Sequence, residues 1–157
     1  MGQGIKLNQN NTELYLRLGE VEILAARNLI AKRLSPEELF NKAEVALRKA
    51  IELNPESGEN YLTLTEFYYY LADWRLSQRK EIKPEIEQAL AASEKVLMLN
   101  PKLLEAKALK AALLSLQATT EVELEREKNI SQSKALLIEA LEKKPLLKYK
   151  YEKLGHR

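Results

Sequence analysis

The sequence predicts an all-α fold, an α-solenoid made of three long antiparallel helix hairpins followed by a C-terminal capping helix. Three observations support this prediction. The 157-residue chain is rich in Ala, Leu, Glu and Lys, which favour helices, and has only five Gly and five Pro. Apolar residues recur along it at helical spacing. The prolines stand at a nearly constant interval, which is typical of stacked helical repeats.

The prolines mark where helices end and begin. Pro55, Pro101 and Pro145 each follow an apolar-periodic run. Each is expected to end a helix, because proline disfavours helical geometry in the residue before it. These three prolines lie 46 and then 44 residues apart. Pro36 and Pro84 are 48 residues apart and suit the first position of a helix, so each interval holds two helices.

The same signals predict the elements in order. Residues 1–10 are expected to be frayed, and residues 11–157 to form a single helical-repeat domain. Its units are expected over 11–55, 56–101 and 102–145, with a cap over 146–157. Thr120 and Glu123 have the spacing of a capping box and are expected to begin the sixth helix. The expected helices lie near 12–33, 36–54, 57–81, 84–99, 102–118, 121–144 and 146–154.

Residue types also recur at fixed offsets within the units. On the first helices, the recurring positions hold Tyr15, Leu18 and Gly19; Tyr61, Leu64 and Thr65; and Lys107, Lys110 and Ala111. On the second helices, they hold Ala43, Leu47, Ala50 and Pro55; Ala89, Ser93, Val96 and Pro101; and Ser133, Leu137, Ala140 and Pro145. This pattern resembles the tetratricopeptide repeat family. The resemblance implies that small residues let the two helices of a hairpin approach closely, while bulky ones fill the space between hairpins.

The repeat length departs from that family, whose unit has about 34 residues. The extra length here amounts to roughly six residues per helix, or about 9 Å at 1.5 Å per residue. The period also falls in the range of HEAT and armadillo repeats, but the recurring offsets favour the tetratricopeptide-like interpretation. The stretch "YLTLTEFYYYLADWRLSQRKEIKPEIEQALAASEKVLMLNP" also resembles long helical repeats found downstream of the kinase domain in some bacterial serine/threonine kinases. The chain lacks the glycine-rich loop and the HRD and DFG motifs, so the resemblance implies no kinase activity.

An aromatic cluster, "EFYYYLADW", occupies residues 66–74. Tyr68 continues the helical stripe of Tyr61, Leu64 and Leu71, so it is expected to be the core ring of the triplet. Phe67 and Trp74 lie beside that stripe and are expected to meet the neighbouring hairpin or its extended tip. Tyr69 and Tyr70 project away from Tyr68. They are candidates for partner contact, although they could instead cover the extended hairpin.

The resemblance implies that the first helices of the units line a concave groove. The candidate partner-binding residues are Arg17, Glu20, Glu59, Thr63, Glu66, Tyr69, Tyr70 and Glu105. Such a groove would be acidic and partly apolar, and would suit a basic or amphipathic protein segment. An alternative applies to Glu59 and Glu105, because a glutamate in the first turn is favoured by the helix dipole wherever it faces. Glu20 and Glu66 lie further along their helices.

Composition argues against several function classes. There is no Cys, and the only His is His156 beside the C-terminus. With no nucleophile constellation or converging polar cluster, the chain is not expected to be an enzyme or to hold a cofactor or metal. No apolar run approaches the roughly 20 residues of a membrane span, and the N-terminus does not resemble a signal peptide, so no membrane association and a cytoplasmic location are expected.

The sequence therefore favours a non-catalytic scaffold that binds a protein or peptide segment on its concave face. One alternative is self-association, as a structural piece of a larger repeat protein or a kinase regulatory tail. The least favoured hypothesis is RNA binding by basic hairpin tips and the basic tail. Net charge is only +2, and the basic residues form no continuous stripe, so nucleic acid is not the expected partner.

Overall fold

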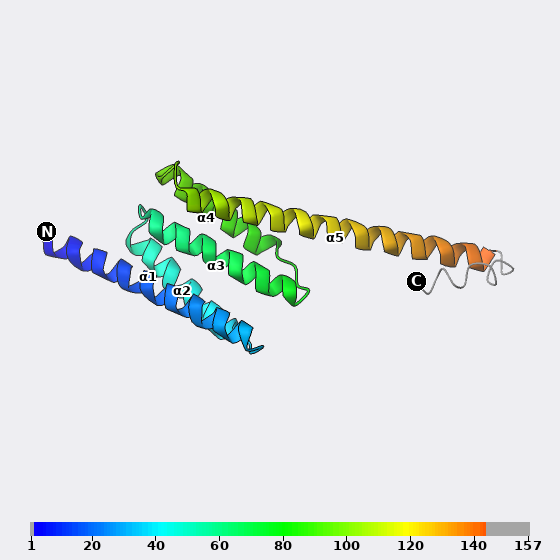
Figure 1. Cartoon of the computed structure of the whole chain (residues 1–157), viewed down its shortest axis with the longest axis horizontal. Coiled ribbons are helices and arrows are strands. Elements are labelled where there is room, and N and C mark those ends of the chain that lie inside the picture. Colours follow the sequence, from blue (N-terminus) through cyan, green and yellow to red (C-terminus); the bar gives the residue numbers. More distant parts are fainter. Residues whose placement is uncertain (1, 144–157) are drawn as a thin grey trace. The chain divides into compact units, whose positions relative to one another are not determined.

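The computed structural model of the chain describes residues 2–143, with side chains from Asn11 onward. This part is helical with no strand, so the all-α prediction is confirmed (Figure 1). The predicted capping helix over 146–154 lies outside the described residues. The helices are α1 (Gly2–Ala31), α2 (Glu37–Leu53), α3 (Gly58–Ser77), α4 (Lys83–Leu99) and α5 (Leu104–Lys143).

The chain divides into two compact units, Met1–Ser115 and Leu116–Arg157, and the boundary falls inside α5. In the first unit, α1 packs against α2 and α3 packs against α4. A short connection joins the helices within each pair, so the two pairs are antiparallel hairpins (Figure 1). The third helix joins the hairpins together, because α3 also contacts both α1 and α2.

Small residues line the second helix of each hairpin, as the repeat pattern predicts. On α2, Ala43, Leu47 and Ala50 are fully buried. Their equivalents on α4 are Ala89, Ser93 and Val96, and these are fully buried too. Small side chains at these positions bring the paired helices close together and leave few voids. The pattern of small and bulky residues therefore predicted the core of α2 and α4 correctly.

The backbone repeats where each helix ends. Arg33 and Arg79 follow α1 and α3 and adopt left-handed conformations, with φ of 59° and 58°. Asn54 and Asn100 cap the ends of α2 and α4 with φ of −145° and −144°. Both pairs are separated by 46 residues, the same interval as between Pro55 and Pro101. The two hairpins thus end their helices in the same way at equivalent positions.

The aromatic cluster is divided between core and surface. Tyr68 is only 4% exposed, which confirms it as the core ring of the triplet. Its hydroxyl accepts a hydrogen bond from Arg48 and donates one to Glu44 of the same neighbouring helix. Phe67 and Trp74 both pack against Phe40 of α2, with ring centroids 6.0 and 5.9 Å apart. The two rings therefore meet the preceding hairpin, as predicted.

The first helix begins earlier than predicted. The sequence predicts a start near residue 12 and fraying over residues 1–10, but α1 begins at Gly2. There is no proline in this stretch to interrupt a helix, and an existing helix extends at little cost for each added residue. Leu18 also departs from the repeat pattern. It is 44% exposed, whereas Leu16, two residues before it, is buried.

The third predicted hairpin is absent from the structure, because residues 104–143 form one continuous helix. The predicted break at 119–120 and the capping box of Thr120 with Glu123 are therefore wrong. The Thr120 hydroxyl donates instead to the carbonyl of Leu116 at 3.0 Å, one turn earlier in the same helix. With no Gly or Pro in this stretch, two threonines are too weak a signal to end a helix.

The second unit includes the C-terminal part of α5. Its described residues, 116–143, continue α5 as a single helix whose side chains are mostly exposed to solvent. Several of these exposed side chains are large and apolar, among them Val122, Leu124, Ile130, Leu136 and Ile138. Among residues 2–143, none of the helices combines the length and the apolar character that a membrane span requires.

Candidate partner-binding surface

The candidate residues of α1 and α3 fall in two rows along their helices. On α1 the row contains the candidates Arg17 and Glu20, three residues apart, and Glu13, four residues before Arg17. On α3 the corresponding row contains Glu59, Thr63, Glu66 and Tyr70. Residues at such intervals share one helical face. An ion pair between Arg17 and Glu59 joins the two rows, so they lie on adjoining sides of the contact between α1 and α3.

Arg17 is the centre of an ion-pair network that joins the rows. Its guanidinium donates to both carboxylate oxygens of Glu20, at 3.0 and 2.8 Å, and to Glu13 at 3.4 Å. It also reaches across to Glu59 of α3 at 3.1 Å. The hydrogen bonds and charge of Glu20, followed by those of Glu59, raise the pKa of Arg17 further above its ordinary value. One arginine thus faces three carboxylates, which leaves this end of the surface acidic.

Glu66 lies further along α3 and is half-buried. Burial is the main cause that raises its pKa, and the negative charges of Glu20 and Glu105 raise it further. The positive charge of Arg27 acts in the opposite direction. Glu66 and Glu105 form no ion pair with any of the described residues. The carboxylates of Glu20 on α1 and Glu105 on α5 therefore both act on Glu66 of α3, which has no cation bonded to it within the part of the chain that the structure describes.

The two candidate tyrosines contact each other beside Glu66. The rings of Tyr69 and Tyr70 pack edge to face with centroids 5.7 Å apart, and both remain partly exposed. The guanidinium carbon of Arg27 lies 4.3 Å from the centre of the Tyr70 ring, a cation–π geometry. Tyr70 thus has a structural contact with α1, and both rings keep accessible area for a partner.

Thr63 does not belong to the accessible surface, because it is only 4% exposed. Its position in the α3 row was predicted from spacing alone. Since α3 packs against helices on more than one side, a short threonine side chain does not extend beyond its neighbours as a glutamate does. The other seven candidates all retain some exposure: Arg17, Glu20, Glu59, Glu66, Tyr69, Tyr70 and Glu105.

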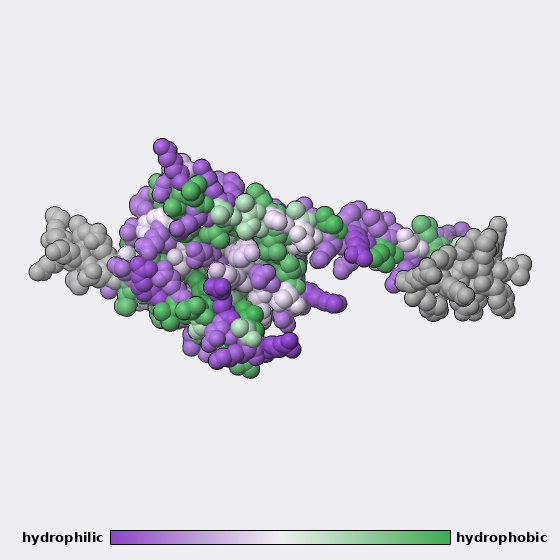
Figure 2. All heavy atoms as spheres, in the orientation of Figure 1, coloured by the Kyte–Doolittle hydropathy of each residue, from purple (hydrophilic) through white to green (hydrophobic). Residues whose placement is uncertain are grey.

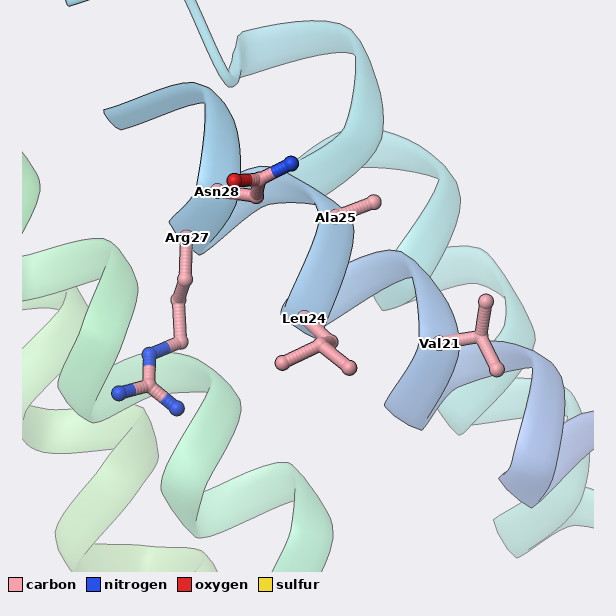
Figure 3. A pocket seen from close by; sticks show the side chains of 5 residues that line it. All are labelled: Val21, Leu24, Ala25, Arg27 and Asn28. Carbon is pink, nitrogen blue, oxygen red and sulfur yellow. The ribbon is translucent and has the colours of Figure 1, made fainter. Parts of the chain in front are cut away.

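Arg27 was not among the sequence-predicted residues, although it contacts Tyr70 and acts on Glu66. It lies seven residues after Glu20, so spacing on α1 could have identified it. Arg27 also borders a shallow pocket of about 670 Å³ on α1 that is lined by Val21, Leu24, Ala25, Arg27 and Asn28. Figure 3 shows its guanidinium extending from α1 towards the neighbouring helices.

Among the described residues, no group of three or more acidic or histidine side chains is arranged to hold a metal ion. Comparison with protein-family models, with curated proteins and with solved structures finds no match to this chain.

Proposed function

We propose that this protein is a non-catalytic scaffold that binds a basic segment of another protein on the surface formed by α1, α3 and the first turns of α5. The observation that carries the proposal is the position of Glu66. It is half-buried, it is close enough to Glu20 and Glu105 to be influenced by their charges, and it lacks an ion-pair partner in the described chain. A lysine or arginine of a bound segment would supply the missing cation.

The proposed architecture is a tetratricopeptide-like stack in which α1 and α3 are equivalent first helices and α5 begins a third unit. It is supported by the left-handed turns at Arg33 and Arg79 and by the matching caps at Asn54 and Asn100. In this arrangement Glu13, Glu59 and Glu105 occupy equivalent positions. The first helices would then present their side chains along one continuous surface.

The physical basis of binding would be twofold. Glu66 is partly removed from water and close to like charges, so a cation placed there gains more than it would at a fully exposed carboxylate. Tyr69 and Tyr70 offer apolar rings with hydrogen-bonding hydroxyls next to this charge, a combination that is common in protein interfaces. The acidic surface would also speed the encounter with a basic segment.

The helix dipole offers an alternative explanation for Glu59 and Glu105, which lie in first turns. It does not apply to Glu20 or Glu66, because each lies more than one turn from the start of its helix. These two residues are therefore the ones to vary in a test of function.

A crosslinking experiment tests the proposal. A photoreactive phenylalanine analogue at Tyr69 should capture a partner protein in cells, whereas the same group at Val45, an exposed residue of α2, should not. The capture should be lost in the double variant Glu20→Lys with Glu66→Lys. A charge-matched control, Glu81→Lys with Glu87→Lys, changes exposed residues at and near the start of α4 and should preserve the capture. Equal capture by all variants would contradict the proposal, and a captured nucleic acid would favour the RNA-binding hypothesis.

Self-association is the second candidate function. One observation favours it, namely an exposed apolar face on α1.

A further inference from the structure

The outer side of α1 carries an unpartnered apolar face. Leu14, Leu18, Val21 and Leu24 are 65%, 44%, 62% and 64% exposed. Single exposed leucines are ordinary on protein surfaces, but a continuous row of them along a helix indicates an interaction site. Figure 2 shows hydrophobic side chains among polar ones on the side of the molecule where α1 lies. The helix buries a different side, which includes Leu16, Ile23 and Ala26.

The spacing on this face is that of a coiled-coil seam. Starting at residue 11, the seam positions follow at alternating intervals of three and four residues, the pattern by which one helix packs along another. They hold Asn11, Leu14, Leu18, Val21, Ala25 and Asn28. The seam is apolar in the middle and has an exposed asparagine at each end. The helix that would match this seam best is therefore one that is also apolar in the middle and polar at both ends.

The pocket on α1 supplies a second observation. Four of its lining residues are Val21, Leu24, Ala25 and Asn28 (Figure 3). They are related as i, i+3, i+4 and i+7, which is the set of four that forms the hole for a side chain inserted from a facing helix. A side chain inserted from a facing helix would therefore contact these four residues, with Arg27 at the edge of the pocket.

We propose that a second copy of this chain binds antiparallel across the seam, with Leu14 of each copy in the pocket of the other. A two-fold axis between Leu18 and Val21 produces this arrangement, because residue numbers that add to 39 then lie opposite each other. The opposed pairs are Leu18 with Val21, Leu14 with Ala25 and Asn11 with Asn28. Apolar residues face apolar residues, and the two amides, which both donate and accept, face each other.

Other occupants fit less well. A parallel second copy would place Ala25 opposite the pocket, and its single methyl group would leave the hole largely empty. A helix that is apolar throughout would leave the amides of Asn11 and Asn28 without partners, which is costly in a buried seam. The flanking positions also suit the antiparallel copy. In an antiparallel pair each flank of the seam meets the same flank of the other copy, so Arg17 would lie beside Leu24 and Tyr15 beside Glu22. No like charges meet there.

Sedimentation velocity over a range of protein concentrations tests the association. The wild-type chain should form dimers, and Leu14→Lys should remain monomeric at concentrations where the wild type is mostly dimeric. Val45→Lys is the control, because Val45 is 71% exposed on α2 and lies outside the seam. It should dimerise like the wild type. A wild-type chain that is monomeric at every concentration, or a Leu14→Lys variant that dimerises normally, would overturn the proposal.

Disulfide trapping tests the direction of the pair, and the chain offers a clean background because it has no cysteine. The double variant Asn11→Cys with Asn28→Cys should form a covalent dimer on oxidation, while neither single variant should. The two positions are roughly 25 Å apart along α1, at 1.5 Å per residue, so they cannot form a bond within one chain. Covalent dimers of the single variants would show a parallel pair and overturn the antiparallel arrangement.

Discussion

Gly19 of α1 lies directly against Leu47 of α2. A methyl group added at Gly19 would come within 2.6 Å of Leu47 Cδ2 and 2.7 Å of Leu47 Cγ, closer than side chains pack in proteins. We expect Gly19→Ala to lower the free energy of unfolding by about 1–3 kcal/mol, because the overpacking outweighs the roughly 1 kcal/mol that alanine gains over glycine in a helix. Chemical denaturation followed by circular dichroism measures the difference.

A variant of Leu47 tests whether its contact with position 19 causes the loss of stability in Gly19→Ala. Leu47→Ala alone should cost about 2–5 kcal/mol by leaving a cavity, but it also removes the atoms that the methyl group added at Gly19 would strike. The double variant should therefore be less destabilised than the two single changes added together. Strict additivity would show that the contact between these two residues does not limit how closely α1 and α2 pack.

Asn60 joins the two hairpins through a buried polar cluster. Its Nδ2 donates to Thr12 Oγ1 and to the Ala50 carbonyl, both at 3.1 Å, and the Thr12 hydroxyl donates to the same carbonyl at 2.7 Å. Asn60→Ala should cost about 2–4 kcal/mol of unfolding free energy, since it leaves buried acceptors short of a donor. Asn41→Ala, at an exposed position on α2, is the matched control and should change stability little. Equal effects of the two variants would contradict the role given to Asn60.

The left-handed residues after α1 and α3 predict two stabilising changes. Arg33 and Arg79 have φ of 59° and 58°, a conformation that costs an L-residue with a side chain roughly 1 kcal/mol but costs glycine little. Arg33→Gly and Arg79→Gly should each raise the melting temperature by a few degrees. Glu87→Gly, at an exposed position in the second turn of α4, should lower it by a similar amount. A fall in melting temperature for both arginine variants would show that their side chains contribute more than the backbone conformation costs.

The raised pKa of Glu66 predicts that the stability of the protein depends on pH. Burial and the neighbouring carboxylates raise its pKa, so the folded state holds this proton more tightly than the unfolded chain does. The protein should therefore gain stability from this group as pH falls through the raised pKa, and lose that gain as pH rises. Glu66→Gln should melt at a higher temperature than the wild type at neutral pH, and the difference should disappear near about pH 4. A variant that is less stable at neutral pH would contradict this account of the carboxylate.

The boundaries of α2 and α4 were predictable because they coincide with strong local signals, whereas the start of α1 was not. Proline and asparagine stand at the ends of α2 and α4, and proline opens α4. The continuity of α5 was not predictable from Thr120 and Glu123. A threonine hydroxyl can cap the start of a helix or bond back to the preceding turn, and the sequence does not indicate which it does. The absence of glycine and proline from this stretch was the more reliable signal.

The candidate surface, like the helix boundaries, was predictable only in part. Spacing placed Glu20, Glu66 and Tyr70 on helical faces that adjoin in the structure, but it could not distinguish accessible residues from covered ones. Thr63 shares the row of Glu66 and is buried, because access depends on the neighbouring helices rather than on periodicity. On α1, apolar residues occur on both the buried and the open side. A pattern in the sequence alone cannot show which of two apolar faces is left without a partner.

The most direct test of the central claim is the affinity of the segment captured at Tyr69 for the wild-type chain and its charge variants, measured by calorimetry at neutral pH. We expect Glu20→Lys with Glu66→Lys to weaken binding by at least about tenfold, equivalent to about 1.4 kcal/mol, and Glu81→Lys with Glu87→Lys to change it little. Equal affinity of the two double variants would contradict a binding surface centred on Glu66.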